Sequence, residues 1–386
     1  MIPLREIAWD CRHFLGDRPC VWHKREGARC TCDHYDRVDE RLLIVKLDAM
    51  GDVLRSTALL PPLAGVHPKA AITWITRRES VPLLQRNPYV TEILELGPEA
   101  TIHVQTRTFD RVINLDASKI SSALATAARS PRKDGFVLDQ RGIVQPTNDA
   151  ARRWLEVGLF DDLKRQGRAT YQDRMADMLD LSGCSHEYVL QLGDDEQTAG
   201  GRHLESIGVD LERPVIGLNT GAGGRWLLKQ WREDGYVELV GRLSQTMPDL
   251  QFVLLGGPSE EERHERLKAK SPVRLLDAGC DNPVRHFASI IEHCNLVVTG
   301  DTLAMHIALA RKKRTVVVFG PTSAREIELY GLGEKVFPDM GCLSCYKTSC
   351  DFVPNCMDLI TTDMMERAVT RQLEVALASR VTETVA

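Results

Sequence analysis

The sequence lacks any apolar run near the roughly 20 residues that a membrane-spanning helix needs. Its first residues, MIPLREIAWDCRHF, contain no apolar segment of the kind found in signal peptides. Basic residues are not in excess, since 49 Lys and Arg stand against 54 Asp and Glu and the net charge is −5. No nucleic-acid partner is therefore expected. We expect a globular, cytoplasmic protein, whose cysteines serve as thiolates or metal ligands rather than in disulfides.

The 386 residues are too many for one ordinary core and predict two domains. Short apolar strands alternate with helical patterns between residues 41 and 136, and the alternation restarts at Pro214. This order predicts an α/β fold with two parallel sheets, each covered by helices on both faces, and a ligand cleft between the domains. The polar stretch 193–213 is the predicted linker. The last helix, about 362–379, is expected to pack back on the N-terminal domain. The expected parts are an N-terminal extension (1–40), an N-terminal domain (41–192), a C-terminal domain (193–360) and a final helix (361–386).

The most informative segment is LLIVKLDAMGDVLRSTALL, residues 42–60. A buried strand leads into the tight turn 48–52, and a helical pattern follows from Val53. This layout places Asp52 beside the free N–H groups of a helix, at the strand end where open α/β sheets bind ligands. A carboxylate held ionised there can take a proton from a substrate hydroxyl. The same residue can also be an N-cap alone, and the segment by itself leaves both interpretations open.

A glycine-rich turn follows the predicted strand VIGLN. It reads Thr220-Gly221-Ala222-Gly223-Gly224, with Arg225 next and Lys229 shortly after. Small residues let backbone N–H groups approach an anion, and the two cations can neutralise a diphosphate. The turn is neither a dinucleotide fingerprint, because Trp226 takes the sixth position, nor a P-loop. The alternative is an ordinary glycine turn beside a chance basic pair.

Three more predicted strands end in polar or glycine turns. Glu260 follows LGGPS and suits the diol of a ribose, or else simply begins a helix. Asp301-Thr302 stands at a strand-to-helix turn with His306 one turn further on, although a single helical histidine is more often packed than ligand-binding. The next strand ends in Gly320-Pro321-Thr322. Since the ends of parallel strands share one edge, we predict that these turns form one binding edge.

Taken together, these segments resemble the ADP-heptose heptosyltransferases of bacterial lipopolysaccharide synthesis, glycosyltransferase family 9, across about 41–378. The resemblance rests on KLDAMGDVLRSTALLPPL, GAGGRWLLKQW, LGGPSEEERHERL, GDTLAMHIALA and FGPT. It implies the GT-B fold, in which two Rossmann-like domains face a central cleft and the C-terminal domain holds the sugar nucleotide.

The resemblance also implies roles for individual residues. Asp52 matches the proposed catalytic base, Lys229 a phosphate ligand and Glu260 a ribose ligand. The implied donor-binding set is Gly51, Thr220, Gly221, Gly223, Arg225, Lys229, Glu260, Asp301, Thr302 and His306. The implied reaction is inverting transfer, in which cations and loop amides stabilise the departing ADP. No catalytic divalent metal is expected, since neither cleft turn contains Asp-x-Asp. The glycine-rich loop is longer than in the best-known lipopolysaccharide enzymes.

The expected function is transfer of a heptose or related sugar from an ADP-sugar to a hydroxyl of the lipopolysaccharide core or another glycan. Alternatives are transfer to a protein or natural-product acceptor, and a non-enzymatic metal-finger binding module on a degenerate scaffold. The retained Asp52, Lys229, Glu260 and Asp301 argue against degeneracy. The expected partners are the ADP-sugar and a glycan, lipid-linked or protein acceptor. Peripheral contact with the inner membrane and homo-oligomer formation are compatible with the resemblance.

Eight of the 11 cysteines fall into two groups. The first has the spacing C-x2-C-x4-C-x5-C, which predicts a tetrahedral Zn²⁺ site, with iron as the alternative. Its members are Cys342, Cys345, Cys350 and Cys356. Many relatives contain a similar segment, and in the autotransporter heptosyltransferases, which glycosylate protein, a four-cysteine finger binds iron and supports assembly. We expect a structural role near the acceptor side.

The second group lies in the N-terminal extension, which is too short to bury a core and would be stabilised by a metal. Its members are Cys11, Cys20, Cys30 and Cys32, with His13, His23 and His34 between them. Because the spacing is loose, a histidine can replace one thiol. The remaining cysteines, Cys184, Cys280 and Cys294, are expected to be simply buried.

Overall fold

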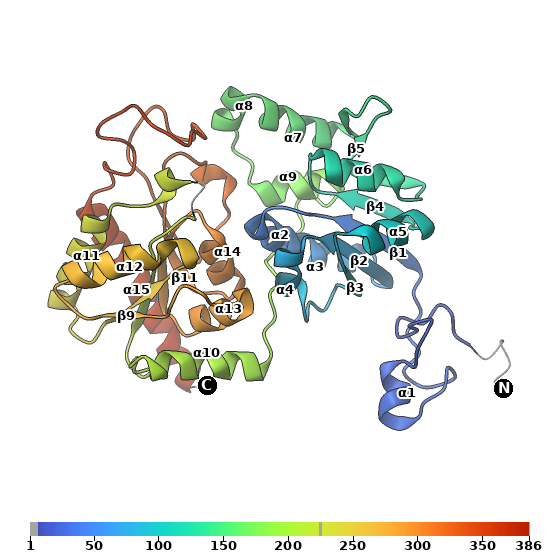
Figure 1. Cartoon of the computed structure of the whole chain (residues 1–386), viewed down its shortest axis with the longest axis horizontal. Helices are drawn as coiled ribbons and strands as arrows, with labels where there is room; N and C mark the ends of the chain where they lie inside the picture. The colour runs from blue at the N-terminus through green and yellow to red at the C-terminus, as the bar shows by residue number, and fades with distance from the viewer. Residues whose placement is uncertain (1–6, 224–225, 386) are drawn as a thin grey trace. The chain divides into compact units, whose positions relative to one another are not determined.

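The computed structural model describes residues 7–223 and 226–385 (Figure 1). Arg225, one of the expected diphosphate ligands, lies outside the described residues. The chain divides into two compact units. The first comprises Met1–Ala49, Ser56–Leu155 and Arg174–His186, and the second Met50–Arg55, Glu156–Asp173 and Glu187–Ala386. Each unit contains a six-stranded sheet, as the predicted α/β fold requires.

The sheet of the first unit has the strand order β3-β2-β1-β4-β5-β6 and is parallel except for β6. β1 lies in its middle, so residues 42–45 are buried on both faces, which explains their unbroken apolar run. The strands are β1 (Glu40–Val45), β2 (Ala70–Thr76), β3 (Glu92–Glu95), β4 (Arg111–Asn114), β5 (Arg132–Leu138) and β6 (Val144–Pro146).

Most helices of residues 21–178 are short. They are α1 (Val21–Glu26), α2 (Met50–Ser56), α3 (Leu60–Val66), α4 (Val81–Leu84), α5 (Pro98–Thr106), α6 (Lys119–Ala127), α7 (Asp149–Leu159), α8 (Asp161–Gln166) and α9 (Tyr171–Met178). Helix α2 begins at Met50, three residues before the predicted start at Val53. Asp52 is consequently in the first turn of the helix rather than in the turn before it.

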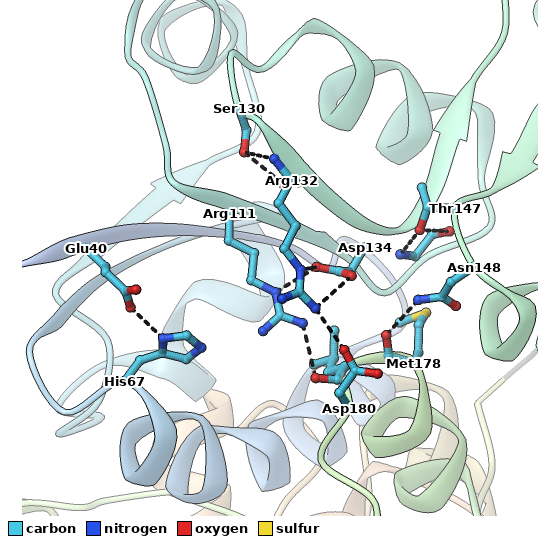
Figure 2. Close-up of polar contacts among 12 residues, drawn as sticks. Glu40, His67, Arg111, Ser130, Arg132, Asp134, Thr147, Asn148, Met178 and Asp180 are labelled. Atoms are coloured by element: carbon cyan, nitrogen blue, oxygen red, sulfur yellow. Dashed lines mark hydrogen bonds and ion pairs between the residues drawn. The ribbon is translucent and has the colours of Figure 1, made fainter.

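A partly buried ion-pair network joins β4, β5 and the segment after α9 in the first unit (Figure 2). Arg111 donates from Nε to Asp134 Oδ2 at 2.7 Å and from Nη2 to the Leu179 carbonyl at 3.1 Å. Arg132 donates to the same Asp134 oxygen at 3.0 Å and to Asp180 at 2.9 Å. Because these groups lie toward the amino ends of the strands, away from the ligand-binding edge, the network holds the fold together.

The sheet of the second unit is parallel throughout, with the order β12-β11-β10-β7-β8-β9. Its strands are β7 (Val215–Asn219), β8 (Gln251–Leu255), β9 (Leu275–Asp277), β10 (Leu296–Gly300), β11 (Arg314–Val318) and β12 (Gly333–Val336). Its longer helices are α10 (Asp194–Ser206), α11 (Glu233–Thr246), α12 (Glu261–Lys270), α13 (Val284–Glu292), α14 (Leu303–Ala310) and α15 (Thr362–Val385).

The predicted linker is mostly helix α10, which packs closely against α13. A Cβ atom added at Gly200 would lie 2.4 Å from the Ser289 carbonyl oxygen. The polar composition of the segment indicated a linker, but its two small glycines allow the helix to approach its neighbour.

We expected the last helix to pack on the N-terminal domain. The buried side chains of α15 lie instead in the core of the second unit, together with Val298 of β10 and Val316 of β11. They recur with helical spacing, and they are Met365, Ala368, Val369 and Leu373. Within the described residues, neither this helix nor any other is both long and apolar enough to cross a membrane.

Candidate active site

The polar turns of the second unit lie at one edge of its sheet. Strands β11, β10, β7 and β8 are direct neighbours and all parallel, so their carboxyl ends are side by side. The turns after them contain Gly320, Asp301, Thr220 and Gly256. The common edge predicted from the sequence is therefore present, at the location where α/β sheets bind ligands.

Lys229 and Asp301 form a largely buried ion pair at this edge. The Lys229 ammonium lies 2.8 Å from Asp301 Oδ2 and 3.1 Å from the Asp301 carbonyl oxygen. Burial opposes ionisation of Asp301, but the charge of Lys229 outweighs it, and the pKa of Asp301 is lowered. An ammonium has three N–H donors. With two of them used by Asp301, the third can be directed at an anion.

His306 lies buried at the same edge. Burial, reinforced by the nearby Arg55 guanidinium, lowers the pKa of His306 to about 4, so the imidazole is neutral at pH 7. Its Nδ1 is 3.2 Å from the Tyr188 hydroxyl. That hydroxyl also accepts a hydrogen bond from Gln172 Nε2 at 3.0 Å. A Cβ atom added at Gly51 would lie 2.7 Å from the His306 ring, so only glycine allows this close approach.

Asp52 is paired with Arg55, three residues further along α2. Arg55 Nη2 is 2.7 Å from Asp52 Oδ1, and the Asp52 side chain remains 34% exposed. The guanidinium carbon lies 3.5 Å from the centre of the Tyr171 ring. Burial opposes the charge on Arg55, but the Asp52 carboxylate outweighs it and the pKa of Arg55 is raised. Arg55 therefore stays charged and favours the ionised form of Asp52.

The glycine-rich turn after β7 is held by Glu260. The Gly223 N–H donates to Glu260 Oε1 at 3.2 Å, and Gly223 has a φ of +65°. A Cβ atom added at Gly221 would lie 2.1 Å from Glu260 Cγ, so the turn has no space for a side chain there. Thr220 is buried, and its hydroxyl has no hydrogen-bond partner in the described structure. That unpaired hydroxyl is available for a ligand.

Two predicted donor ligands also have structural roles. Glu260 accepts from the Gly257 N–H at 2.9 Å and from Ser259 Oγ at 3.0 Å, as the helix-start interpretation predicted. Thr302 Oγ1 accepts from Asn219 Nδ2 at 3.2 Å and lies 3.0 Å from Thr299 Oγ1. Both side chains therefore hold the turns in place, and their contacts with a donor stay predictions.

The family model of glycosyltransferase family 9 (heptosyltransferase) matches residues 102–354. The chain belongs to glycosyltransferase family 9. It is thus a glycosyltransferase, and the family resemblance noted in the sequence is confirmed.

This glycosyltransferase is similar to several named proteins. Lipopolysaccharide heptosyltransferase 2 of Salmonella typhimurium is 26% identical over 301 residues, which cover 73% of this chain and 83% of that protein. A family 9 glycosyl transferase from Veillonella parvula has a similar structure, with a TM-score of 0.71 at 18% identity, covering 87% of this chain and 97% of the other. The structure of the E. coli ADP-heptose lipopolysaccharide heptosyltransferase II has a TM-score of 0.66 at 20% identity, and the match covers 86% of this chain and 98% of the other.

An iron-containing dodecameric glycosyltransferase, TibC from enterotoxigenic E. coli, is also similar in structure. Its TM-score is 0.53 at 15% identity, and the match covers 92% of this chain and 81% of TibC. These likenesses confirm the predicted fold class, two Rossmann-like α/β units of the GT-B type.

Sequence reasoning missed several residues of the site in this glycosyltransferase. Arg55 pairs with Asp52 and packs on Tyr171, and Tyr188 contacts His306 and accepts from Gln172. Of these four residues, only Arg55 is near Asp52 or His306 in the chain. The spacing of Asp52 and Arg55, three apart at a helix start, was the one available signal. Gln172 and Tyr188 lie outside every motif that we recognised.

In neither cysteine group do at least three potential ligand atoms, among the described residues, lie within 4.8 Å of one another. Burial, together with the thiols of Cys345, Cys350 and Cys342, raises the pKa of Cys356 to about 11. Cysteines of the N-terminal group line a pocket of about 500 Å³ together with His13, His23 and His34; they are Cys11, Cys20, Cys30 and Cys32. Cys20 also accepts from the His23 N–H as the N-cap of α1.

Three other side chains bring potential metal-ligand atoms close together. Among the residues that the structure describes, ligand atoms within 4.8 Å of one another occur in His264, Asp277 and Cys280. His264 Nδ1 is 2.9 Å from Asp277 Oδ1 and 3.4 Å from Cys280 Sγ. The expectation that the scattered cysteines are simply buried is correct for Cys294 but wrong for Cys184, which is exposed, and for Cys280, which is half-buried.

Proposed function

We propose that this enzyme transfers a heptose from ADP-heptose, with inversion, to a hydroxyl group of the lipopolysaccharide core. The proposed donor and acceptor follow the names of the similar heptosyltransferases. The supporting observation in this chain is the convergence of Lys229, His306 and Asp52 in the second unit. A cation with one N–H donor to spare, a neutral imidazole and a partly exposed carboxylate are the groups that such a transfer uses.

The donor would bind at the turns after β7, β8 and β10. Lys229 directs its remaining N–H at the diphosphate, and the Thr220 hydroxyl and neighbouring backbone amides complete the phosphate contacts. Arg225 would add a second cation, as its place in the sequence indicates. Glu260 has both oxygens engaged by N–H and O–H donors but retains acceptor capacity for a ribose hydroxyl.

Asp52 would act as the general base. The acceptor oxygen attacks the anomeric carbon from the face opposite ADP, and Asp52 takes the proton of that hydroxyl. The bond between the anomeric carbon and the diphosphate oxygen breaks, and its electron pair leaves with ADP. The charge that develops on the diphosphate is stabilised by Lys229. Arg55 keeps Asp52 ionised and oriented through its 2.7 Å contact.

We also propose that Cys342, Cys345, Cys350 and Cys356 hold one structural metal ion, zinc or iron. Four thiols within a short segment suit either ion. Iron occurs in the structurally similar TibC. A second ion is proposed in the N-terminal group, because its four cysteines and three histidines line one pocket. The metal would hold backbone segments together and take part in no chemical step.

The domain roles are proposals of the same kind. We assign the acceptor side to residues 41–192 and the donor side to 193–360, because the phosphate-binding turns belong to the second sheet. We place the enzyme in the cytoplasm, with peripheral contact at the inner membrane, where a lipid-linked acceptor would be reached.

Calorimetric titration with ADP, UDP and GDP tests the donor class without an acceptor. Tighter binding of ADP is expected, and equal binding of all three would contradict the proposed donor. A transfer assay with ADP-heptose and isolated lipopolysaccharide core then tests the acceptor. Release of ADP with the heptose transferred only to water would contradict the lipopolysaccharide core as the acceptor.

A further inference from the structure

A buried glutamine and two tyrosines form a hydrogen-bonded group beside His306, and the steps proposed above give them no role. Gln172 Nε2 donates to the Tyr188 hydroxyl at 3.0 Å and to the Tyr330 hydroxyl at 3.0 Å. The Tyr188 hydroxyl in turn lies 3.2 Å from His306 Nδ1. All four residues belong to the second unit. The group therefore connects helix α9, which contains Gln172, to the imidazole on α14.

The orientation of the Gln172 amide decides which way these hydrogen bonds run. Gln172 is fully buried, and the two N–H groups of its amide match the two hydroxyl oxygens. Its carbonyl oxygen Oε1 has no partner in the described structure. If the amide were turned over, its NH₂ would be the group without a partner, and orphaned buried N–H groups are rarer than orphaned carbonyl oxygens. Gln172 is therefore the donor to both tyrosines.

This donation determines where the Tyr188 hydroxyl sends its own proton. The oxygen accepts from Gln172, and His306 Nδ1 is the one acceptor that bonds the hydroxyl among the described residues, so the O–H donates to Nδ1. Burial raises the pKa of Tyr188, so the hydroxyl keeps its proton at neutral pH. A neutral imidazole has one N–H, and the hydrogen bond at one ring nitrogen decides which nitrogen holds it. His306 therefore holds its proton on Nε2.

The Nε2 edge of the ring faces the start of α2. A Cβ atom added at Gly51 would lie 2.7 Å from His306 Cδ2 and 3.2 Å from Nε2. Asp52 follows Gly51, and Asp301, with Lys229 paired to it, lies just before α14. No hydrogen bond engages Nε2 within the part of the chain that the structure describes. Its N–H is therefore available at the sheet edge where the sugar donor is proposed to bind.

We propose that Gln172 and Tyr188 are positioning residues that set the tautomer of His306, so that its Nε2–H donates a hydrogen bond to the diphosphate of the sugar donor. This hydrogen bond stabilises the charge that develops on the departing diphosphate, beside Lys229, and no proton is transferred. Asp52 remains the base, because the other ring nitrogen is occupied by Tyr188. The proposal rests on the proposed transfer from an ADP-sugar and adds two residues to it.

The first experiment determines the tautomer without any substrate. NMR of enzyme with isotope-labelled histidine rings distinguishes protonated from unprotonated ring nitrogens, and the signals missing from His306→Gln assign this ring. At pH 7, Nε2 of His306 should be protonated and Nδ1 unprotonated. A proton on Nδ1 instead would overturn the proposal. This measurement uses the wild-type enzyme, so it does not depend on the folding of any tyrosine variant.

Tyr188→Phe removes the hydroxyl and keeps the aromatic ring. The His306 Nδ1 signal should shift, or a second tautomer should appear, because the hydrogen bond at that nitrogen is lost. Tyr330→Phe is the matched control, since it removes the other hydroxyl that Gln172 bonds but leaves the contact between Tyr188 and His306. It should keep the Nε2–H tautomer. Identical His306 signals in Tyr188→Phe and the wild type would show that Tyr188 does not set the tautomer.

Kinetics with ADP-heptose then measure the consequence for transfer. Tyr188→Phe should lower turnover about tenfold and change the donor KM little, because the hydrogen bond acts mainly in the transition state. His306→Leu should be slower still, whereas His306→Gln, which can place an amide N–H near the position of Nε2–H, should retain more turnover. The double variant Tyr188→Phe/His306→Leu should be no slower than His306→Leu alone. A further tenfold loss in the double variant would contradict a role of Tyr188 through His306.

Failure of the proposed transfer would give a different pattern of results. If the wild type neither binds ADP nor transfers heptose, the donor assignment and the diphosphate contact are both wrong, and the NMR spectra still decide the tautomer. If ADP binds and heptose is transferred, but the effects of Tyr188→Phe and His306→Leu are additive, only the positioning role is wrong.

Discussion

Two arginine–aspartate pairs in this molecule have nearly the same contact distance but different surroundings. Arg111 and Asp134 in the first unit lie 2.7 Å apart, with 6% and 8% of their side chains exposed. Arg55 and Asp52 in the second unit also lie 2.7 Å apart, but Asp52 is 34% exposed. Asp134 receives hydrogen bonds from two arginines, and Arg111 also bonds a carbonyl. Arg55 has an unpaired Nε and packs on an aromatic ring.

This difference separates a pair that stabilises the fold from one that is suited to chemistry. A buried carboxylate surrounded by arginines has no access to a substrate, and removal of one partner leaves a buried charge. A carboxylate that keeps an accessible face can accept a proton from solvent or substrate. Burial of an ion pair alone is therefore no sign of function; the accessible face of Asp52 is the informative feature.

The largest expected effect is the loss of turnover on changing Asp52, the accessible member of its pair with Arg55. Asp52→Asn should lower the turnover number by about 10²–10⁴-fold, because the amide cannot accept the acceptor proton. ADP affinity should stay close to the wild-type value. Transfer kinetics and calorimetry measure the two quantities. Asp48→Asn, in the turn just before α2, is the matched control and should keep most of the activity. Full activity of Asp52→Asn would exclude it as the base.

A change in the buried pair of Arg111 and Asp134 should lower the free energy of unfolding rather than the activity. Arg111→Met leaves Asp134 buried with one arginine partner and should cost about 3–5 kcal/mol of the free energy of unfolding. Urea denaturation followed by circular dichroism measures it. Arg132→Gln, whose side chain is 49% exposed, should cost much less. If Arg111→Met unfolds at the wild-type urea concentration, the network has no role in stability.

His306, which lies near the accessible pair of Asp52 and Arg55, should make the folding stability depend on pH. Its pKa is about 4 in the folded protein, against about 6.5 when unfolded, so the unfolded chain binds more protons between these values. Stability should therefore fall by up to about 3 kcal/mol as the pH drops from 6.5 to 4. His306→Gln should remove this part of the pH dependence. Urea titrations of both proteins at pH 4.5–7.5 test it, and parallel curves would contradict the assigned pKa.

Lys229 should have the smallest of these effects. Lys229→Met removes the charged hydrogen bond proposed to reach the diphosphate and leaves the Asp301 carboxylate without its partner, so it should weaken ADP binding by about 10–100-fold. Lys270→Met, at the exposed end of α12, is the control and should leave ADP affinity unchanged. Calorimetric titration with ADP measures both. An unchanged dissociation constant for Lys229→Met would place the diphosphate elsewhere.

Sequence reasoning located the elements whose signals are local. The apolar run 42–45 became the central strand β1, and the turns at Thr220, Asp301 and Gly320 all lie at one sheet edge. It failed where packing outweighed composition, since the polar segment after Gly193 is helix α10 rather than a linker. The two glycines of this segment allow close contact between α10 and α13.

By itself, the sequence showed which polar residues follow which predicted strands. Asp52 follows the first strand, the glycine-rich turn follows the strand VIGLN, and Asp301 and His306 follow a later one. The order of strands and turns depends on residues that are neighbours in the chain, so it can be predicted from the sequence. Only the tertiary structure decided that Tyr188 contacts His306, that Gln172 bonds Tyr188, and that the Arg55 guanidinium packs on Tyr171. Such contacts join residues far apart in sequence, and only the packing of whole elements brings them together.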